Sequence, residues 1–173
     1  RGFRPGGVNR RDTGRNGVPP FTQFPPYKAD FLDNFELGWK TSWLDNSLRF
    51  NGALYYQNWK DFQYSYLGPN AFTIVTNAGG AHIKGLEADL QWAATSQLLL
   101  TTGLAYTDAE LTTDFCKQLS NGQPLPAASC PRVSFAPKGQ RLPITPKFKG
   151  NVTARYGFSL GSLDAHVQAA GVY

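Results

Sequence analysis

Eight charged residues are the first candidates for chemistry, because they recur at alternate positions within otherwise apolar stretches. Glu87 and Asp89 form the closest carboxylate pair, a grouping that general acid–base catalysis uses. No nucleophile or histidine lies beside them, and the sequence has no nucleophile elbow, His-Glu-x-x-His helix or phosphate-binding glycine loop. We therefore expect no catalytic residue, no cofactor and no enzyme activity. The eight charged candidates are Glu36, Lys40, Arg49, Glu87, Asp89, Lys147, Lys149 and Arg155.

The two cysteines, Cys116 and Cys130, lie in one loop-like segment. Structural zinc sites need four nitrogen or sulfur ligands, and His82 and His166 are isolated, so no metal site is predicted. A disulfide between the cysteines, formed in an oxidising compartment, is the preferred interpretation. Two free thiols are the alternative.

The charged residues must be carried by β-strands with two unlike faces. In residues 32–43, Phe35, Leu37 and Trp39 alternate with Glu36 and Lys40, and successive side chains of a strand point to opposite faces. The same alternation returns in residues 48–66, 86–92, 98–107, 142–158 and 163–169, and a partial strand is expected at residues 2–8. The apolar positions expected to face lipid are Phe35, Leu37, Trp39, Phe50, Leu54, Leu86, Leu90, Leu100, Leu104, Phe148, Val152 and Tyr156.

Aromatic residues and connection lengths favour a membrane barrel over a soluble β-sandwich. Trp43, Trp92 and Phe158 end apolar faces next to turns, as interfacial girdles do. No apolar run approaches the roughly 18–20 residues of a membrane helix. Outer-membrane barrels have short periplasmic turns and long extracellular loops. The short connections here are residues 44–47, 93–96 and 159–162, and the long ones are residues 9–30, 68–77 and 113–141.

We therefore predict an all-β fold, an antiparallel meander of about seven long strands that is an open fragment of a transmembrane β-barrel. The formal charge of +5 does not indicate nucleic acid, because the basic residues do not share one helix face. Several of them open the chain in a Gly/Pro-rich segment, where a loop near anionic lipid headgroups explains them. Outer-membrane lipid and lipopolysaccharide are the partners expected.

A colinear series of motifs resembles TonB-dependent receptors over essentially the whole chain. These motifs are GFRPGGVNR at residues 2–10, NFELGWK at 34–40, NGALYYQNWKDFQ at 51–63, NAGGA at 77–81, KGLE at 84–87, LAYTDAE at 104–110 and GQRLPITP at 139–146. The resemblance implies a 22-stranded barrel with an N-terminal plug, energised by the TonB–ExbB–ExbD complex. Residues 1–173 would be part of this barrel, without the plug, the earlier strands or the closing strand. None of the family's transport-coupling residues falls on this sequence.

The resemblance implies active transport of a scarce nutrient. A ferric siderophore is the expected ligand, with cobalamin or an oligosaccharide ranked behind it. A passive porin and a soluble β-rich binding domain are the alternative functions. The eight charged residues would line the substrate path, or form a hydrated wall that pairs internally and contacts the plug.

A disulfide between Cys116 and Cys130 would close a loop of about 15 residues and stabilise the fold by roughly 3 kcal/mol in the chain-entropy model. We predict that mass spectrometry of non-reduced peptides from the full-length protein shows this link. Two freely alkylated thiols in protein isolated from outer membranes would contradict it.

Overall fold

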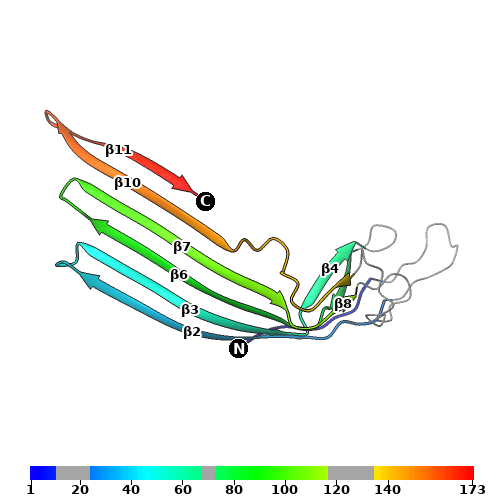
Figure 1. Ribbon diagram of the computed structural model, residues 1–173. Coiled ribbons are helices and arrows are strands. Elements are labelled where there is room, and N and C mark those ends of the chain that lie inside the picture. The colour runs from blue at the N-terminus through cyan, green and yellow to red at the C-terminus, as the bar shows by residue number, and fades with distance from the viewer. Residues whose placement is uncertain (11–23, 68–72, 117–134) are drawn as a thin grey trace, which may run out of the picture. The chain divides into compact units, whose positions relative to one another are not determined.

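A computed structural model describes residues 1–10, 24–67, 73–116 and 135–173. These residues form an antiparallel, seven-stranded sheet in the order β1-β2-β3-β6-β7-β10-β11, so that neighbours in the sheet follow the chain (Figure 1). The strands are β1 (Gly2–Arg4), β2 (Asp30–Trp43), β3 (Leu48–Lys60), β6 (Ala81–Ala93), β7 (Leu98–Leu111), β10 (Phe148–Leu160) and β11 (Leu163–Val172). The predicted all-β meander is confirmed. No α-helix in the described ranges has the length and apolar character needed to cross a bilayer.

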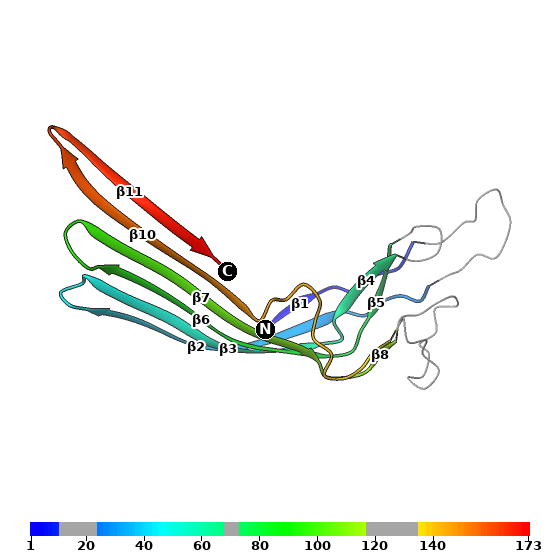
Figure 2. The same ribbon diagram turned by 45° about the horizontal axis from the view of Figure 1, so that its top comes forward.

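Two small sheets accompany the large one. Strands β4 (Gln63–Leu67) and β5 (Thr73–Asn77) pair with each other, as Figure 2 shows, and β8 (Phe115–Cys116) pairs with β9 (Phe135–Ala136). Within the described residues, β1 and β11 are the two edge strands of the large sheet. The sheet is therefore open at both edges, as predicted.

The register around β10 establishes the two faces of the sheet. Val152 pairs with Thr102 of β7 and Gly171 of β11, whereas Asn151 pairs with Gly103 and Val172. Directly paired residues of an antiparallel sheet lie on the same face. Continued along the strands, one face carries Leu100, Leu104, Phe148, Val152, Ala154 and Tyr156, and the other carries Thr101, Lys149, Asn151, Thr153, Arg155 and Gln168.

Tight connections join the strand pairs at residues 44–47, 94–97 and 161–162. Leu44, Asp45 and Asn46 all have positive φ, and the backbone N–H and the hydroxyl of Ser47 both donate to the Leu44 carbonyl. Asp and Asn tolerate this left-handed conformation better than other residues with a Cβ. In the β10–β11 turn, Gly161 has φ 63°, where the missing Cβ removes the steric penalty.

The predicted strand limits were most clearly wrong in four places, and the predicted loop at residues 113–141 also contains the two-residue strands β8 and β9. The run at residues 48–66 breaks at Asp61, which has φ 51° and separates β3 from β4. The predicted loop at residues 68–77 contains β5, and the partial strand at residues 2–8 ends at Arg4, before Pro5. Pro also explains the fourth error: residues 142–147 are not strand, because two prolines remove backbone donors and Ile144 has φ 60°. Leu142 and Ile144 therefore do not extend the apolar face of β10.

The described chain divides into two compact units, which differ in where their apolar residues lie. Unit 1 comprises Arg1–Asn34, Gln57–Ile83 and Ala109–Leu142, and unit 2 comprises Phe35–Tyr56, Lys84–Asp108 and Pro143–Tyr173. Every buried apolar side chain of the described residues belongs to unit 1. These side chains are Phe24, Phe62, Tyr66, Ile74, Ala78, Ala81, Ala109 and Leu111. Unit 1 thus has a small core of its own.

Unit 2 carries its large apolar residues at the surface. Leu37 is 70% exposed, Phe148 60% and Val152 54%. A contiguous exposed apolar face of this kind is unusual in a water-soluble monomer and marks a contact with lipid or another protein.

The NAGGA segment at residues 77–81 connects β5 to β6 inside unit 1. The Asn77 amide donates to the backbone carbonyls of Lys28 (3.0 Å) and Asp61 (2.6 Å), and its oxygen accepts from the Lys28 N–H (2.7 Å). Gly79 has φ 78°, and a Cβ there would collide with the Thr113 hydroxyl. Asn, Gly and small Ala residues are therefore required by hydrogen bonding and by close packing.

Val152→Arg places a charge on the exposed apolar face of β10, whereas Asn151→Arg places the same charge on the opposite face. If the apolar face contacts lipid, Val152→Arg costs roughly 2–4 kcal/mol at mid-depth, and Asn151→Arg costs far less. Leu37→Arg on β2 should behave like Val152→Arg. Reversible unfolding of the full-length protein into lipid vesicles measures these costs, and equal costs for Val152→Arg and Asn151→Arg would contradict the assignment of faces.

Candidate functional site

A groove of about 1140 Å³ crosses the sheet of unit 2, and its lining includes charged residues together with the apolar Trp39, Leu104 and Phe148; we call it the polar groove for its charged residues. Strands β2, β3, β6, β7 and β10 contribute to it, and Val172 and Tyr173 line its margin. The groove is hollow because the positions between the charged residues are small. Gly38, Ala53, Gly103 and Ala105 occupy those positions on the polar face.

Hydrogen bonds across strands hold the polar side chains of this face. The Asn51 amide donates to an Asp89 carboxylate oxygen at 3.0 Å, from β3 to β6. The Tyr55 hydroxyl and the Thr107 hydroxyl lie 2.8 Å apart, although β6 separates their strands. Gly85 of β6 makes this crossing feasible, because a Cβ there would collide with the Tyr55 side chain. These hydrogen bonds hold polar side chains in place on this face of the sheet.

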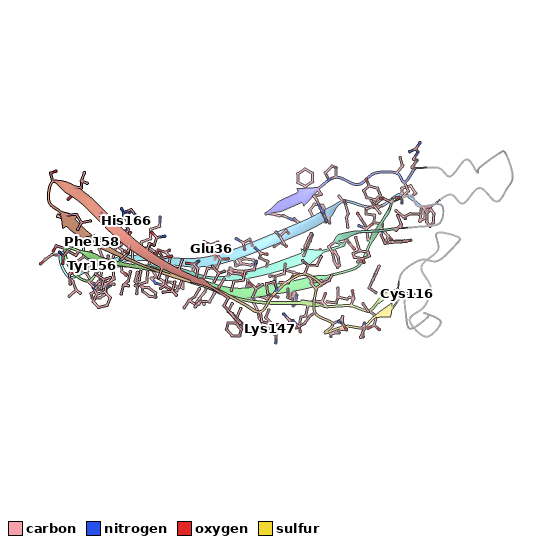
Figure 3. All side chains as sticks on the ribbon, turned by 90° about the horizontal axis from the view of Figure 1, so that it is seen from above. Glu36, Cys116, Lys147, Tyr156, Phe158 and His166 are labelled. Carbon is pink, nitrogen blue, oxygen red and sulfur yellow. The ribbon has the colours of Figure 1, made fainter. Side chains whose placement is uncertain are left out.

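Five of the eight predicted charged residues come together in the groove: Glu36, Lys40, Glu87, Asp89 and Lys149. Arg155 instead lines a smaller hollow of about 450 Å³ with Asp164 and His166, and its guanidinium is 3.4 Å from the His166 Nδ1 atom. Figure 3 shows side chains on both surfaces of the sheet, with Glu36 and His166 labelled on one of them. Arg49 and Lys147 line neither hollow, and Lys147 immediately precedes β10.

The groove has exposed carboxylates, ammonium groups and amides that are suited to ligand contacts. Glu87 and Asp89 are exposed on β6, and Asp89 accepts a hydrogen bond from the Asn51 amide. Within the described ranges, no cluster of three His, Cys, Asp or Glu residues is arranged to hold a metal. Cys116 lies in β8 and no described cysteine is free, but Cys130 falls outside the described residues, so their pairing stays a prediction.

Asp30 is the buried carboxylate of the described chain, with 1% of its surface exposed. The Arg4 guanidinium contacts both of its oxygens, at 3.1 and 3.0 Å through Nε and more closely through Nη2. The Trp59 indole N–H donates at 3.1 Å and the Gln63 backbone N–H at 3.0 Å. All four residues belong to unit 1, and they join β1, β2, β3 and β4.

Opposing effects determine the pKa of Asp30, which lies before the exposed apolar stretch of β2 that starts at Phe35. Burial raises this pKa, because the charged form loses water. Hydrogen bonds from Arg4, Gln63 and Trp59 and the charge of Arg4 favour the carboxylate more strongly, and the pKa falls from 3.8 to about 2. Asp30 is therefore a charged anchor for the strand ends of unit 1.

Asp30 was not among the functional residues predicted from the sequence. Its partners Arg4, Trp59 and Gln63 lie 26, 29 and 33 residues away along the chain. The local pattern around Asp30 is that of an ordinary strand start, and no short-range spacing signals partners so distant.

The strand order, the two unlike faces and the exposed apolar surface define a wall segment of a transmembrane β-barrel. The whole chain, residues 1–173, matches the family described as TonB dependent receptor-like, beta-barrel. The chain therefore belongs to the TonB-dependent receptor family, whose barrels lie in the bacterial outer membrane.

A solved structure shows the same fold. It is the ferric yersiniabactin uptake receptor FyuA from Yersinia pestis, 17% identical in sequence, with a TM-score of 0.62. The similarity covers 98% of this chain and 21% of the FyuA chain, so this chain spans about a fifth of that receptor's length. No curated protein sequence matches this chain.

Asp30→Asn should destabilise unit 1 by about 2 kcal/mol at neutral pH, since folding lowers the pKa of Asp30 from 3.8 to about 2 and a tenfold change in an equilibrium constant is about 1.36 kcal/mol. Because the folded-state pKa is lowered, this contribution is fully present above about pH 4 and disappears as the pH falls through about 2. Hydrogen exchange of the Gln63 amide in the full-length protein, followed from pH 7 downward, measures the effect.

Asp33→Asn provides the matched control. Asp33 pairs with Lys60 (3.0 Å) and Arg1 (3.3 Å), but these pairs are solvent-screened and contribute little. Equal increases in Gln63 exchange for Asp30→Asn and Asp33→Asn at neutral pH would contradict the anchoring role of Asp30.

Proposed function

We propose that the chain forms part of the barrel of an active outer-membrane transporter for a ferric siderophore, energised by the TonB–ExbB–ExbD complex. The match to the TonB-dependent receptor family over residues 1–173 carries this proposal. FyuA, which shares the fold, is a ferric yersiniabactin uptake receptor, and this supports the ligand class.

The two faces of unit 2 fit such a wall. The exposed apolar face suits lipid, and the groove with Glu36, Glu87 and Lys149 suits a hydrated interior. In that interior the groove would contact the passing ligand or the plug. The exposed carboxylates and amines would remain solvated there, which avoids the cost of burying a charge.

Uptake of radiolabelled ferric siderophores by cells that express the full-length gene tests the function. We expect saturable uptake of at least one ferric siderophore in a host with TonB, and none in the same host without TonB. Cobalamin and an oligosaccharide serve as comparison ligands. Uptake that rises linearly with concentration and does not require TonB would contradict active transport and identify a passive porin.

Asp89→Ala and Gln91→Ala test the contribution of the groove in the same assay. Both residues belong to β6 and fall on the polar face by strand alternation, but only Asp89 lines the groove. We expect Asp89→Ala to lower the uptake rate at equal surface expression, because it removes the partner of Asn51, and Gln91→Ala to leave the rate unchanged. Equal rates for both variants would remove the groove from the transport path.

A further inference from the structure

A second groove, of about 570 Å³, lies on the apolar face of unit 2. Its apolar side chains come from four neighbouring strands: Phe35 and Leu37 of β2, Leu54 and Tyr56 of β3, Leu86 of β6 and Tyr106 of β7. Phe35 is 65% exposed and Leu54 48%. The groove is therefore an open apolar channel on the surface of the sheet, and an apolar occupant would remove this surface from water.

Two charged residues also line this groove: the cation Lys84, and the carboxylate Glu36, which strand alternation places on the opposite face. Lys84 precedes Leu86 by two residues on β6, so strand alternation places both side chains on the apolar face. The Lys84 ammonium lies 3.4 Å from a carboxylate oxygen of Asp108 on β7. The Lys84 side chain is 58% exposed and that of Asp108 is 20% exposed. A lysine stem of this kind covers apolar surface while its ammonium remains accessible.

The position of Lys84 along β6 indicates which leaflet it meets. The tight turn after Ala93 ends β6, and Lys84 lies near the other end of this strand. In outer-membrane barrels the tight turns face the periplasm. Given the outer-membrane location of the proposed function, Lys84 lies toward the outer leaflet.

We propose that the apolar groove and Lys84 together bind a phosphorylated acyl lipid of the outer leaflet, such as lipopolysaccharide. An acyl chain lies along Leu37, Leu54 and Leu86, and a lipid phosphate accepts hydrogen bonds from the Lys84 ammonium. The ammonium has three donors and Asp108 engages one side of it, so donors remain for a phosphate.

A phosphate site and a purely structural ion pair predict different results when Lys84 and Asp108 are neutralised one at a time. An ion pair that only ties β6 to β7 loses the same interaction when either partner is neutralised. In a phosphate site, Lys84→Gln removes the group that binds the lipid, whereas Asp108→Asn removes a competing negative charge and keeps the ammonium. In a phosphate site, therefore, only Lys84→Gln is expected to weaken lipid binding.

Lipid binding is measured on purified full-length protein by native mass spectrometry, with a bisphosphorylated lipid A and its dephosphorylated counterpart as probes. We expect Lys84→Gln to weaken binding of the bisphosphorylated lipid about fivefold, the effect of one basic residue near an anionic surface, and to leave the dephosphorylated lipid unaffected. Asp108→Asn should bind the bisphosphorylated lipid as tightly as wild type or more tightly. Lys40→Gln, which removes a lysine from the polar groove, is the matched control and should not change lipid binding.

Three results would overturn the proposal. These are equal weakening by Lys84→Gln and Asp108→Asn, equal loss of both lipids in Lys84→Gln, and complete displacement of the lipid by inorganic phosphate. The last result would show that Lys84 binds anions in general and that the acyl chains do not contribute to the affinity. Because the assay contains no siderophore, its outcome is separate from that of the uptake experiment, and failure of one does not imply failure of the other.

Discussion

Backbone hydrogen bonding in an apolar medium is the constraint on which the rest of the structure depends. A strand in hydrocarbon has no water to satisfy its N–H and C=O groups, so each must pair with a neighbouring strand. The long ladders of β7, β10 and β11 meet this demand, with ten paired positions between β10 and β11 alone. Once the backbone is paired in this way, the side chains alternate faces. Unit 2 consequently has an apolar surface and a polar surface but, among its described residues, no buried apolar side chain.

Unit 1 differs from unit 2 in having buried apolar side chains and buried polar contacts. Its apolar side chains, such as Phe62 and Leu111, pack into a small buried cluster. The strand ends are tied by Asp30 and its partner Arg4, and by the Asn77 amide, rather than by lipid contact. A short apolar core and buried polar anchors are what a water-exposed portion of a barrel protein needs, since lipid cannot cover its apolar groups. The two units therefore differ in whether their apolar side chains are buried within the unit or exposed at its surface.

The sequence predicted well those features that depend on local periodicity. Alternation predicted strands in the regions of β2, β3, β7 and β10, and the three short connections were predicted close to where they lie. It failed where tertiary packing overrides the local pattern. The break at Asp61 and the irregular stretch around Ile144 interrupt runs that still alternate in sequence. The groove needed the register between strands, and the Asp30 cluster joins residues too distant along the chain for any spacing rule to detect.

The central claim is that one face of the sheet meets lipid and the other meets water. Nitroxide labels at successive positions from 148 to 160 of β10 test it most directly, in full-length protein in a bilayer with all native cysteines replaced by alanine. We predict that collision with dissolved oxygen peaks at positions 152, 154 and 156, and that collision with a water-soluble nickel chelate peaks at positions 151, 153 and 155. Both profiles should have a two-residue period and opposite phase. Profiles in phase with each other, or without a two-residue period, would contradict this claim.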